Sequence, residues 1–161
     1  MLPHLDAAYR FARWLGNTRA DAEDIVQEAM LRAFRAHGAL RGEPRPWLLT
    51  IVRNCHVDAH RERQRETSGR GALRDEPLAG FGPDPQLAAI QSQGEAQLQR
   101  LLGELTPEQR EVLALRELAE LSYREIAALL TVPIGTVMSR LARAREALQE
   151  QWTREPDHGV C

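Results

Sequence analysis

Residues 106–148 read TPEQREVLALRELAELSYREIAALLTVPIGTVMSRLARAREAL, and their pattern predicts helices separated by very short breaks. Ser122 is a good N-cap for a helix over residues 123–130, and an acidic residue follows three positions later, as in a capping box. Residues 131–133, Thr-Val-Pro, form a short turn before a last helix over about residues 134–152. Two helices joined by so short a turn are typical of a helix-turn-helix motif.

Another helix is expected just before this motif. Thr106 suits the N-cap, Pro107 suits the first helical position, and Gln109 completes a second capping box. This helix is expected to end near Glu117, and a shorter one over residues 97–105 precedes it. The sequence therefore predicts a small helical domain over residues 95–153.

The last helix of this domain has the pattern of a recognition helix. Apolar residues repeat at intervals of three and four and predict a buried face made of Ile134, Val137, Leu141, Ala144 and Leu148. Arginine can pair with guanine in the major groove, and hydroxyl groups can bind base edges or phosphates. The DNA-binding candidates away from or beside the buried face are Thr136, Ser139, Arg140 and Arg143.

Residues 1–66 predict a second small domain of three helices, over residues 5–15, from about Asp21, and over residues 47–65. The second helix has an apolar stripe of Ala22, Ile25, Val26, Ala29 and Ala33. Its opposite stripe is Asp24, Gln27, Glu28, Leu31 and Arg35, and the leucine among polar residues suggests a partner surface. The third helix has an inner stripe of Leu48, Ile51, Val52, Cys55 and Ala59.

Glycine and proline are dense between the two domains, in residues 67–94, and only Phe81 is a large apolar anchor there. We expect a flexible tether over residues 67–94 and a tail over residues 154–161. The predicted fold class is all-α, with two small helical domains joined by this linker, the second containing the helix-turn-helix.

The charge of the chain is unevenly distributed. The 161 residues include 21 arginines, no lysine and 23 acidic residues, and the net charge of −2 taken alone argues against nucleic-acid binding. By segment, however, residues 21–28 carry −4, residues 75–133 carry −6, and the acid-free residues 134–145 carry +3. The alternation is typical of a chain with more than one kind of partner.

Few other sites are indicated. No apolar run is long enough to span a membrane, and no secretory signal is visible, so a cytoplasmic location without membrane insertion is expected. Cys55, His56 and His60 are potential zinc donors, but no fourth ligand is evident, and a buried cysteine beside solvated histidines is the better interpretation. Cys161 has no catalytic partner in the sequence. We expect no cofactor, no metal and no enzymatic activity.

Three segments together resemble a known family. LGELTPEQREVLALRELAELSYREIAALLTVPIGTVMSRLARAREAL (residues 102–148) resembles the promoter-binding C-terminal domain of a bacterial sigma factor. RADAEDIVQEAMLRAF (residues 19–34) and RPWLLTIVRNCHVDAHRERQRE (residues 45–66) resemble its N-terminal domain. Two domains and a linker resemble the extracytoplasmic-function (ECF) group of the sigma-70 family.

The resemblance implies partners and sites. In the family, the second helix docks on the clamp helices of the largest catalytic subunit of RNA polymerase, and the matching residues here are Asp24, Gln27, Glu28 and Leu31. The third helix recognises and opens the −10 promoter element, and the matching residues are Arg53, Asn54 and Asp58, with Arg61, Arg63 and Arg65 placed to neutralise phosphates. Trp47 is either a core anchor or a contact for an unstacked base.

The resemblance assigns the −35 element to Thr136, Ser139, Arg140 and Arg143. Met138 stands where the family often has a basic residue, which puts the −35 sequence preference in doubt. An anti-sigma factor is a further expected partner. Two alternatives stay open: a stand-alone LuxR-like helix-turn-helix regulator, and an interaction protein that sequesters polymerase through its acidic helix.

Overall fold

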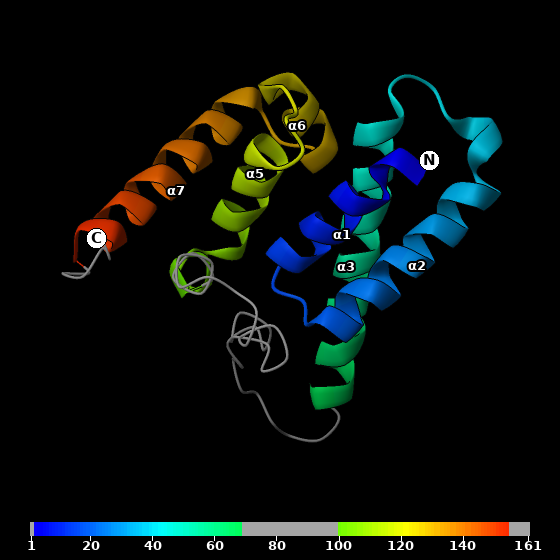
Figure 1. Cartoon of the computed structure of the whole chain (residues 1–161), viewed down its shortest axis with the longest axis horizontal. Helices are drawn as coiled ribbons and strands as arrows, with labels where there is room; N and C mark the ends of the chain where they lie inside the picture. Colours follow the sequence, from blue (N-terminus) through cyan, green and yellow to red (C-terminus); the bar gives the residue numbers. More distant parts are fainter. Residues whose placement is uncertain (1, 69–99, 155–161) are drawn as a thin grey trace, which may run out of the picture. The chain divides into compact units, whose positions relative to one another are not determined.

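The computed structural model describes residues 2–68 and 100–154, and every regular element in these ranges is helical (Figure 1). The chain divides into two compact units at a point within residues 69–99. The predicted all-α fold with two small helical domains is thereby confirmed. The expected tether lies outside the described residues except for residues 67 and 68, which still belong to a helix, and the expected tail does so except for Arg154.

The first unit contains three α-helices that pack against one another, α1 (Leu5–Trp14), α2 (Arg19–Arg35) and α3 (Pro44–Ser68). Two short 3-10 turns, η1 (Leu2–His4) and η2 (His37–Ala39), precede α1 and follow α2. In Figure 1, α1 and α2 both lie against the long α3. Both therefore bury their apolar faces on the same helix.

Helix α2 begins two residues before the predicted Asp21. Thr18 has an extended backbone, and its hydroxyl oxygen accepts a hydrogen bond from the Asp21 amide at 3.1 Å, so it is the N-cap. Asp21 then lies in the first turn, where the positive end of the helix dipole favours an acid. Just before this cap, Gly16 takes a φ of +96°, a conformation that glycine adopts without steric cost and that ends α1.

The predicted stripe on α2 is confirmed, because all five of its residues are buried. Four of the five are alanine or valine, and such small side chains let helix backbones approach closely. On α3 the prediction was partly wrong: Leu48, Val52 and Cys55 are buried, Ile51 and Ala59 are only half-buried, and Leu49 is buried instead. Because α3 packs on both α1 and α2, its buried face is not the single apolar stripe that the sequence period predicts.

The second unit contains a helical segment over residues 100–103, then α5 (Pro107–Glu117), α6 (Tyr123–Leu130) and α7 (Ile134–Arg154). Both predicted capping boxes are present. At the first, the Gln109 amide donates to the Thr106 hydroxyl at 3.2 Å, and the Thr106 amide donates to the Gln109 side chain at 3.1 Å. At the second, Ser122 exchanges the same two bonds with Glu125, at 3.1 Å and 2.7 Å.

The helix-turn-helix is formed by α6 and α7. Thr131 takes a left-handed conformation, with φ +57°, and ends α6. Residues 131–133 then connect it to α7, and the two helix axes are bent by 105°. An angle of about 90–120° is characteristic of the motif.

The core of the second unit lies where α7 crosses α5 and α6. Val137, Leu141 and Ala144 are buried on α7, as predicted. Two residues of the predicted stripe are not: Ile134 is 45% exposed and Leu148 is half-buried. Ile134 opens α7 directly after the turn, where the sharp bend carries the helix start away from the core.

No single helix in residues 2–68 and 100–154 is long and apolar enough to cross a membrane. The bent pair of α6 and α7 passes that test on combined length and composition. Ile126, Leu129 and Leu130 of α6 and Val137 and Leu141 of α7, however, are buried in the core of the second unit.

Candidate nucleic-acid interface

The N-terminal half of α7 brings together the candidates for −35 recognition. Ser139 and Arg143 are exposed, and Thr136 and Arg140 are half-buried at the edge of the core. The Ser139 hydroxyl donates a hydrogen bond to the Thr136 carbonyl at 3.1 Å, so toward a DNA base it is placed to accept. Met138, which stands where the family often has a basic residue, is 53% exposed.

A different arginine of α7 bonds to side chains of α5 and α6. Arg145 Nη2 lies 3.3 Å from Glu117 Oε1 on α5, and hydrogen bonds to Tyr123 and Glu117 raise the pKa of Arg145. The guanidinium of Arg116 lies 5.0 Å from the centre of the Tyr123 ring and donates to the Leu121 carbonyl at 2.9 Å. Arg145 therefore links α7 to α5 and α6, whereas Arg143 points to solvent.

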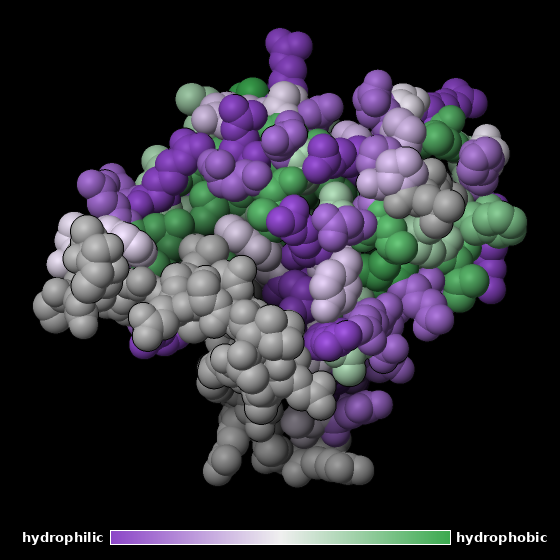
Figure 2. Space-filling model, in the orientation of Figure 1, coloured by the Kyte–Doolittle hydropathy of each residue, from purple (hydrophilic) through white to green (hydrophobic). Residues whose placement is uncertain are grey.

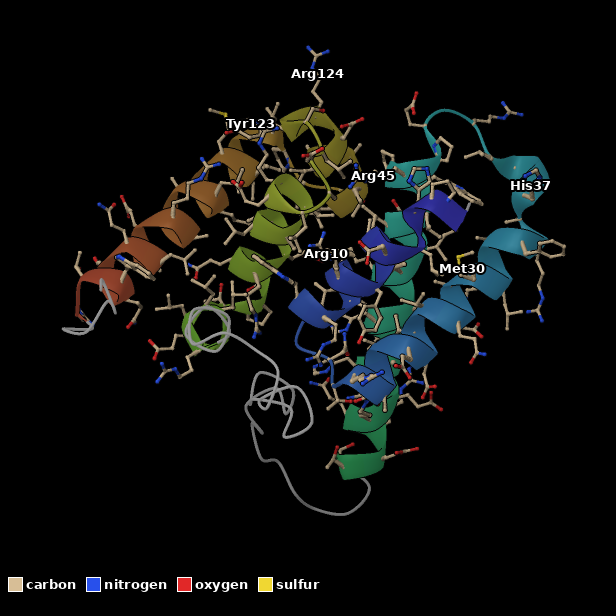
Figure 3. The ribbon with its side chains drawn as sticks, viewed as in Figure 1. Arg10, Met30, His37, Arg45, Tyr123 and Arg124 are labelled. Atoms are coloured by element: carbon tan, nitrogen blue, oxygen red, sulfur yellow. The ribbon has the colours of Figure 1, made fainter. Side chains whose placement is uncertain are left out.

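Arg124 was not among the residues predicted from the sequence. It lies in the first turn of α6, is exposed, and extends away from the second unit in Figure 3, where Tyr123 beside it is directed toward the helices. The first helix of a helix-turn-helix commonly crosses the DNA backbone. The position of Arg124 directly after the Ser122 cap and Tyr123 was the signal that could have identified it.

The candidates for −10 recognition lie along α3. Asn54, Asp58 and Arg61 are exposed, while Arg53 and Trp47 are half-buried. Arg63 is placed 3.5 Å from Asp21 of α2, so it also serves the packing of the first unit. The half-buried indole of Trp47 is compatible with both of its expected roles.

Asp58 takes part in an interaction between helices that the sequence did not predict. Arg32 of α2 donates from Nε to Glu28 at 2.8 Å and from Nη1 to Asp58 at 2.9 Å. We call Arg32, Glu28 and Asp58 the Arg32 network. Two of its members were assigned separately, Glu28 to polymerase and Asp58 to DNA, so the structure connects the two proposed surfaces. The spacing of Glu28 and Arg32 was a visible signal; the partner on α3 was not.

The histidines of α3 differ from expectation. His56 is half-buried, and its Nδ1 lies 3.0 Å from the side-chain nitrogen of the buried Asn17, which also donates to the Ala12 carbonyl at 2.7 Å. Both histidines were expected to be exposed to solvent, and of the two His60 is exposed. Cys55 is 4% exposed, and its burial raises the pKa of the thiol. Within the described residues no group of three or more potential ligands could hold a metal ion.

The candidate docking stripe of α2 is accessible. Asp24 and Gln27 are exposed, Glu28 is half-buried, and Leu31 is 49% exposed. Phe34, which was not predicted as part of the stripe, is 77% exposed one turn after Leu31 and extends the stripe. Figure 2 shows apolar surface on the α2 side of the first unit. Phe34 could have been identified from the sequence, because it stands three residues after Leu31.

Comparison with known proteins shows the family of this chain. Residues 2–66 match the family model described as sigma-70 region 2, and residues 95–148 match the one described as sigma-70 region 4. The chain belongs to the sigma-70 family. Its curated relatives place it in the ECF group of that family.

Two relatives of this sigma-70 chain illustrate the likeness. It is 35% identical over 148 residues to the ECF RNA polymerase sigma factor SigE of Mycolicibacterium smegmatis, covering 91% of the chain and 58% of that protein. It is 38% identical over 152 residues to the ECF sigma factor SigC of Mycobacterium tuberculosis, covering 92% and 78%. The chain thus spans little more than half the length of the first relative.

Solved structures of sigma factors are similar as well. The sigma factor RpoE of Bartonella quintana, in complex with the anti-sigma factor NepR, is 30% identical with a TM-score of 0.79, covering 94% of this chain and 93% of that one. CnrH in complex with the cytosolic domain of CnrY is 25% identical with a TM-score of 0.70, covering 96% and 85%. The LuxR-like alternative gains no support, because residues 2–66 match region 2 and not a receiver or ligand-sensing domain.

Proposed function

We propose that this chain binds core RNA polymerase, recognises −10 and −35 promoter elements and directs transcription initiation. The observation that carries the proposal is the presence of regions 2 and 4, in that order, in one chain whose second unit contains a helix-turn-helix bent by 105°. The chemistry of RNA synthesis would be carried out by the polymerase, and this chain would supply promoter specificity in the cytoplasm.

Each proposed contact has a surface of suitable chemistry. The stripe of Asp24, Gln27, Glu28 and Leu31 would dock on polymerase, with Phe34 adding apolar area. Arg53, Asn54, Arg61 and Trp47 would act at the −10 element, with Asp58 holding α3 to α2 through Arg32. Thr136, Ser139, Arg140 and Arg143 would act at the −35 element, with Arg124 on a phosphate.

We also propose regulation by an anti-sigma factor that covers these same surfaces. The similar structures of RpoE with NepR and of CnrH with the cytosolic domain of CnrY support it. Tagged chain recovered from its native host with a stoichiometric protein partner that blocks polymerase binding is the expected result. Recovery with polymerase alone under all growth conditions would contradict it.

The decisive test is initiation in vitro. Purified chain is added to core RNA polymerase, and transcripts are mapped on a library of genomic promoter fragments. Discrete start sites with shared −10 and −35 sequences are expected only when both components are present. Tight binding of the free chain to duplex DNA, with no initiation on any fragment, would favour a stand-alone regulator and refute the proposal.

The docking surface is tested by charge reversal. Asp24→Arg should weaken binding to core polymerase at least tenfold, since an exposed acid of the stripe becomes a base. Asp6→Arg is the matched control: it makes the same charge change on α1, where the side chain of Asp6 is 81% exposed, and should leave binding unchanged. Equal binding by both variants and the unmodified chain would remove α2 from the interface.

A further inference from the structure

Helix α7 exposes apolar side chains at the end that is expected to enter DNA. Ile134 is 45% exposed and Met138 is 53% exposed, and the two lie one turn apart on the same side of the helix. Gly135 and Ala142 beside them are exposed as well, and a Cβ added at Gly135 would meet nothing within 4 Å. We call Ile134, Gly135, Met138 and Ala142 the apolar strip.

The core of the second unit does not need this strip. Val137, Leu141 and Ala144 fill the contact of α7 with α5 and α6, and each is at most 1% exposed. Gly135, Met138 and Ala142 lie to one side of this buried face, whereas Ile134 is in line with Leu141 but is open to solvent at the start of the helix. Exposing two large apolar side chains on a small domain costs free energy, which a partner that covers them would recover.

Charge around the strip favours DNA as that partner. Residues 134–145 contain no acid, and the half-buried Arg140 and the exposed Arg143 lie on the same half of α7. Arg145, two turns after Met138, is paired with Glu117 at 3.3 Å. An uncharged strip on a half-helix that has no acid and also carries two arginines matches the major groove, where the thymine C5 methyl is the apolar feature among polar base edges.

We infer that Met138, with Ile134 beside it, contacts thymine methyl groups in the −35 element and makes the chain select T·A pairs at one or two positions. The inference rests on the proposed function, because it needs α7 in the major groove. The unbranched thioether of methionine adapts to such a contact, whereas Arg140 and Arg143 would contact guanine or phosphate. Met138 is thus a specificity-determining residue of this particular chain.

The experiment removes single methyl groups from DNA. The −35 sequence is first selected from random duplexes by the complex of full-length chain and core polymerase. Each thymine of the selected element is then replaced by deoxyuridine, which lacks only the C5 methyl, and affinities are measured by competition. At one or two positions the replacement should weaken binding about fourfold, the effect of one buried methyl group.

Variants assign the effect to the residue. Met138→Ala should bind thymine and deoxyuridine duplexes equally at those positions, while Met138→Leu should keep most of the discrimination. Leu5→Ala, which truncates a side chain 39% exposed on α1, is the control and should behave as the unmodified chain does. Since Met138 is exposed, both of its variants should melt at the same temperature as the parent.

Three results would overturn the inference. One is equal binding of thymine and deoxyuridine at every position by the unmodified chain. Another is unchanged discrimination in Met138→Ala, particularly if that variant instead loses affinity for a protein inhibitor, which would assign the strip to a protein partner. The third is failure of the complex to select any −35 sequence, which refutes the proposed function and this inference with it.

Discussion

Replacing Arg32 by methionine should loosen the contact between α2 and α3. Methionine keeps much of the aliphatic stem but removes both charged hydrogen bonds, the one to Glu28 at 2.8 Å and the one to Asp58 at 2.9 Å. The first lies within α2, four residues apart, and the second joins two helices. The second pair therefore carries the information about tertiary packing, and its coupling energy is the quantity to measure.

The expected magnitude follows from exposure. The side chains of Arg32 and Asp58 are 41% and 55% exposed, so solvent screens the pair, and its coupling should fall near the upper end of the surface range, about 0.5–1 kcal/mol. The bond to Glu28 adds about 0.3–0.5 kcal/mol as a helical pair. Loss of both bonds should therefore cost about 1 kcal/mol of unfolding free energy. In a domain of this size, each kcal/mol lost lowers the melting temperature by about 4–8 °C.

A double-mutant cycle measures the coupling. The variants are Arg32→Met, Asp58→Asn and the pair, each unfolded by urea in the full-length chain. The three tryptophans are Trp14, Trp47 and Trp152, so in a Trp152→Phe background fluorescence reports the first unit alone. The cycle is repeated in 1 M salt, where the Debye length falls to about 3 Å and the coupling should shrink.

The exposed pair of Arg10 and Asp6 is the matched control. Its atoms are 3.7 Å apart, and its side chains are 60% and 81% exposed, so the same cycle there should give a coupling near zero. A coupling for Arg32 and Asp58 no larger than this control would refute the structural role of the network. A coupling that persists undiminished in 1 M salt would show that it is not electrostatic.

Three further predictions concern stability. Leu115→Ala empties space in the core of the second unit, where Leu115 is 0% exposed, and should cost about 2–5 kcal/mol of unfolding free energy. Urea unfolding is followed by the fluorescence of Trp152 in a background where Trp14 and Trp47 are replaced by phenylalanine, and a smaller loss would contradict that packing. Thr106→Ala removes a capping box and should cost about 1 kcal/mol by the same measurement, whereas Thr106→Ser should cost little. Because burial raises the pKa of Cys55, its contribution to stability is fully present below the pKa of the unfolded thiol and is lost as pH rises toward the raised value. Between pH 7 and 10 the chain should therefore lose more stability than Cys55→Ala, and equal losses would contradict this.

Local features of this fold could be predicted from the sequence because they depend on neighbouring residues. The capping boxes at Thr106 and Ser122 involve residues three positions apart, and both are present with both hydrogen bonds. The apolar stripe of α2 is buried against the neighbouring helices, as its helical period predicts. The exposure of Leu31 on the opposite side of α2 follows from the same period.

Features that depend on how helices meet could not be predicted. Leu49 is buried because α3 packs on two helices at once, and Ile134 is exposed because α7 starts beyond a bend of 105°. The bond between Arg32 and Asp58 spans 26 residues of sequence, and the one between Asn17 and His56 spans 39. No periodicity in the sequence predicts such pairs, because their residues meet only when the helices pack together.

The arrangement also explains how a chain with net charge −2 can carry both of the proposed surfaces, one for polymerase and one for DNA. Some of its arginines are paired with acids of the same unit: Arg32 bridges α2 and α3, and Arg145 bridges α7 and α5. Such arginines contribute little positive potential outside, because their charge is compensated within bonding distance. Arg61 and Arg143 remain exposed on the faces proposed for DNA. It follows that neutralising Arg143 should reduce the salt dependence of DNA binding, whereas neutralising Arg145 should lower stability and leave that dependence nearly unchanged.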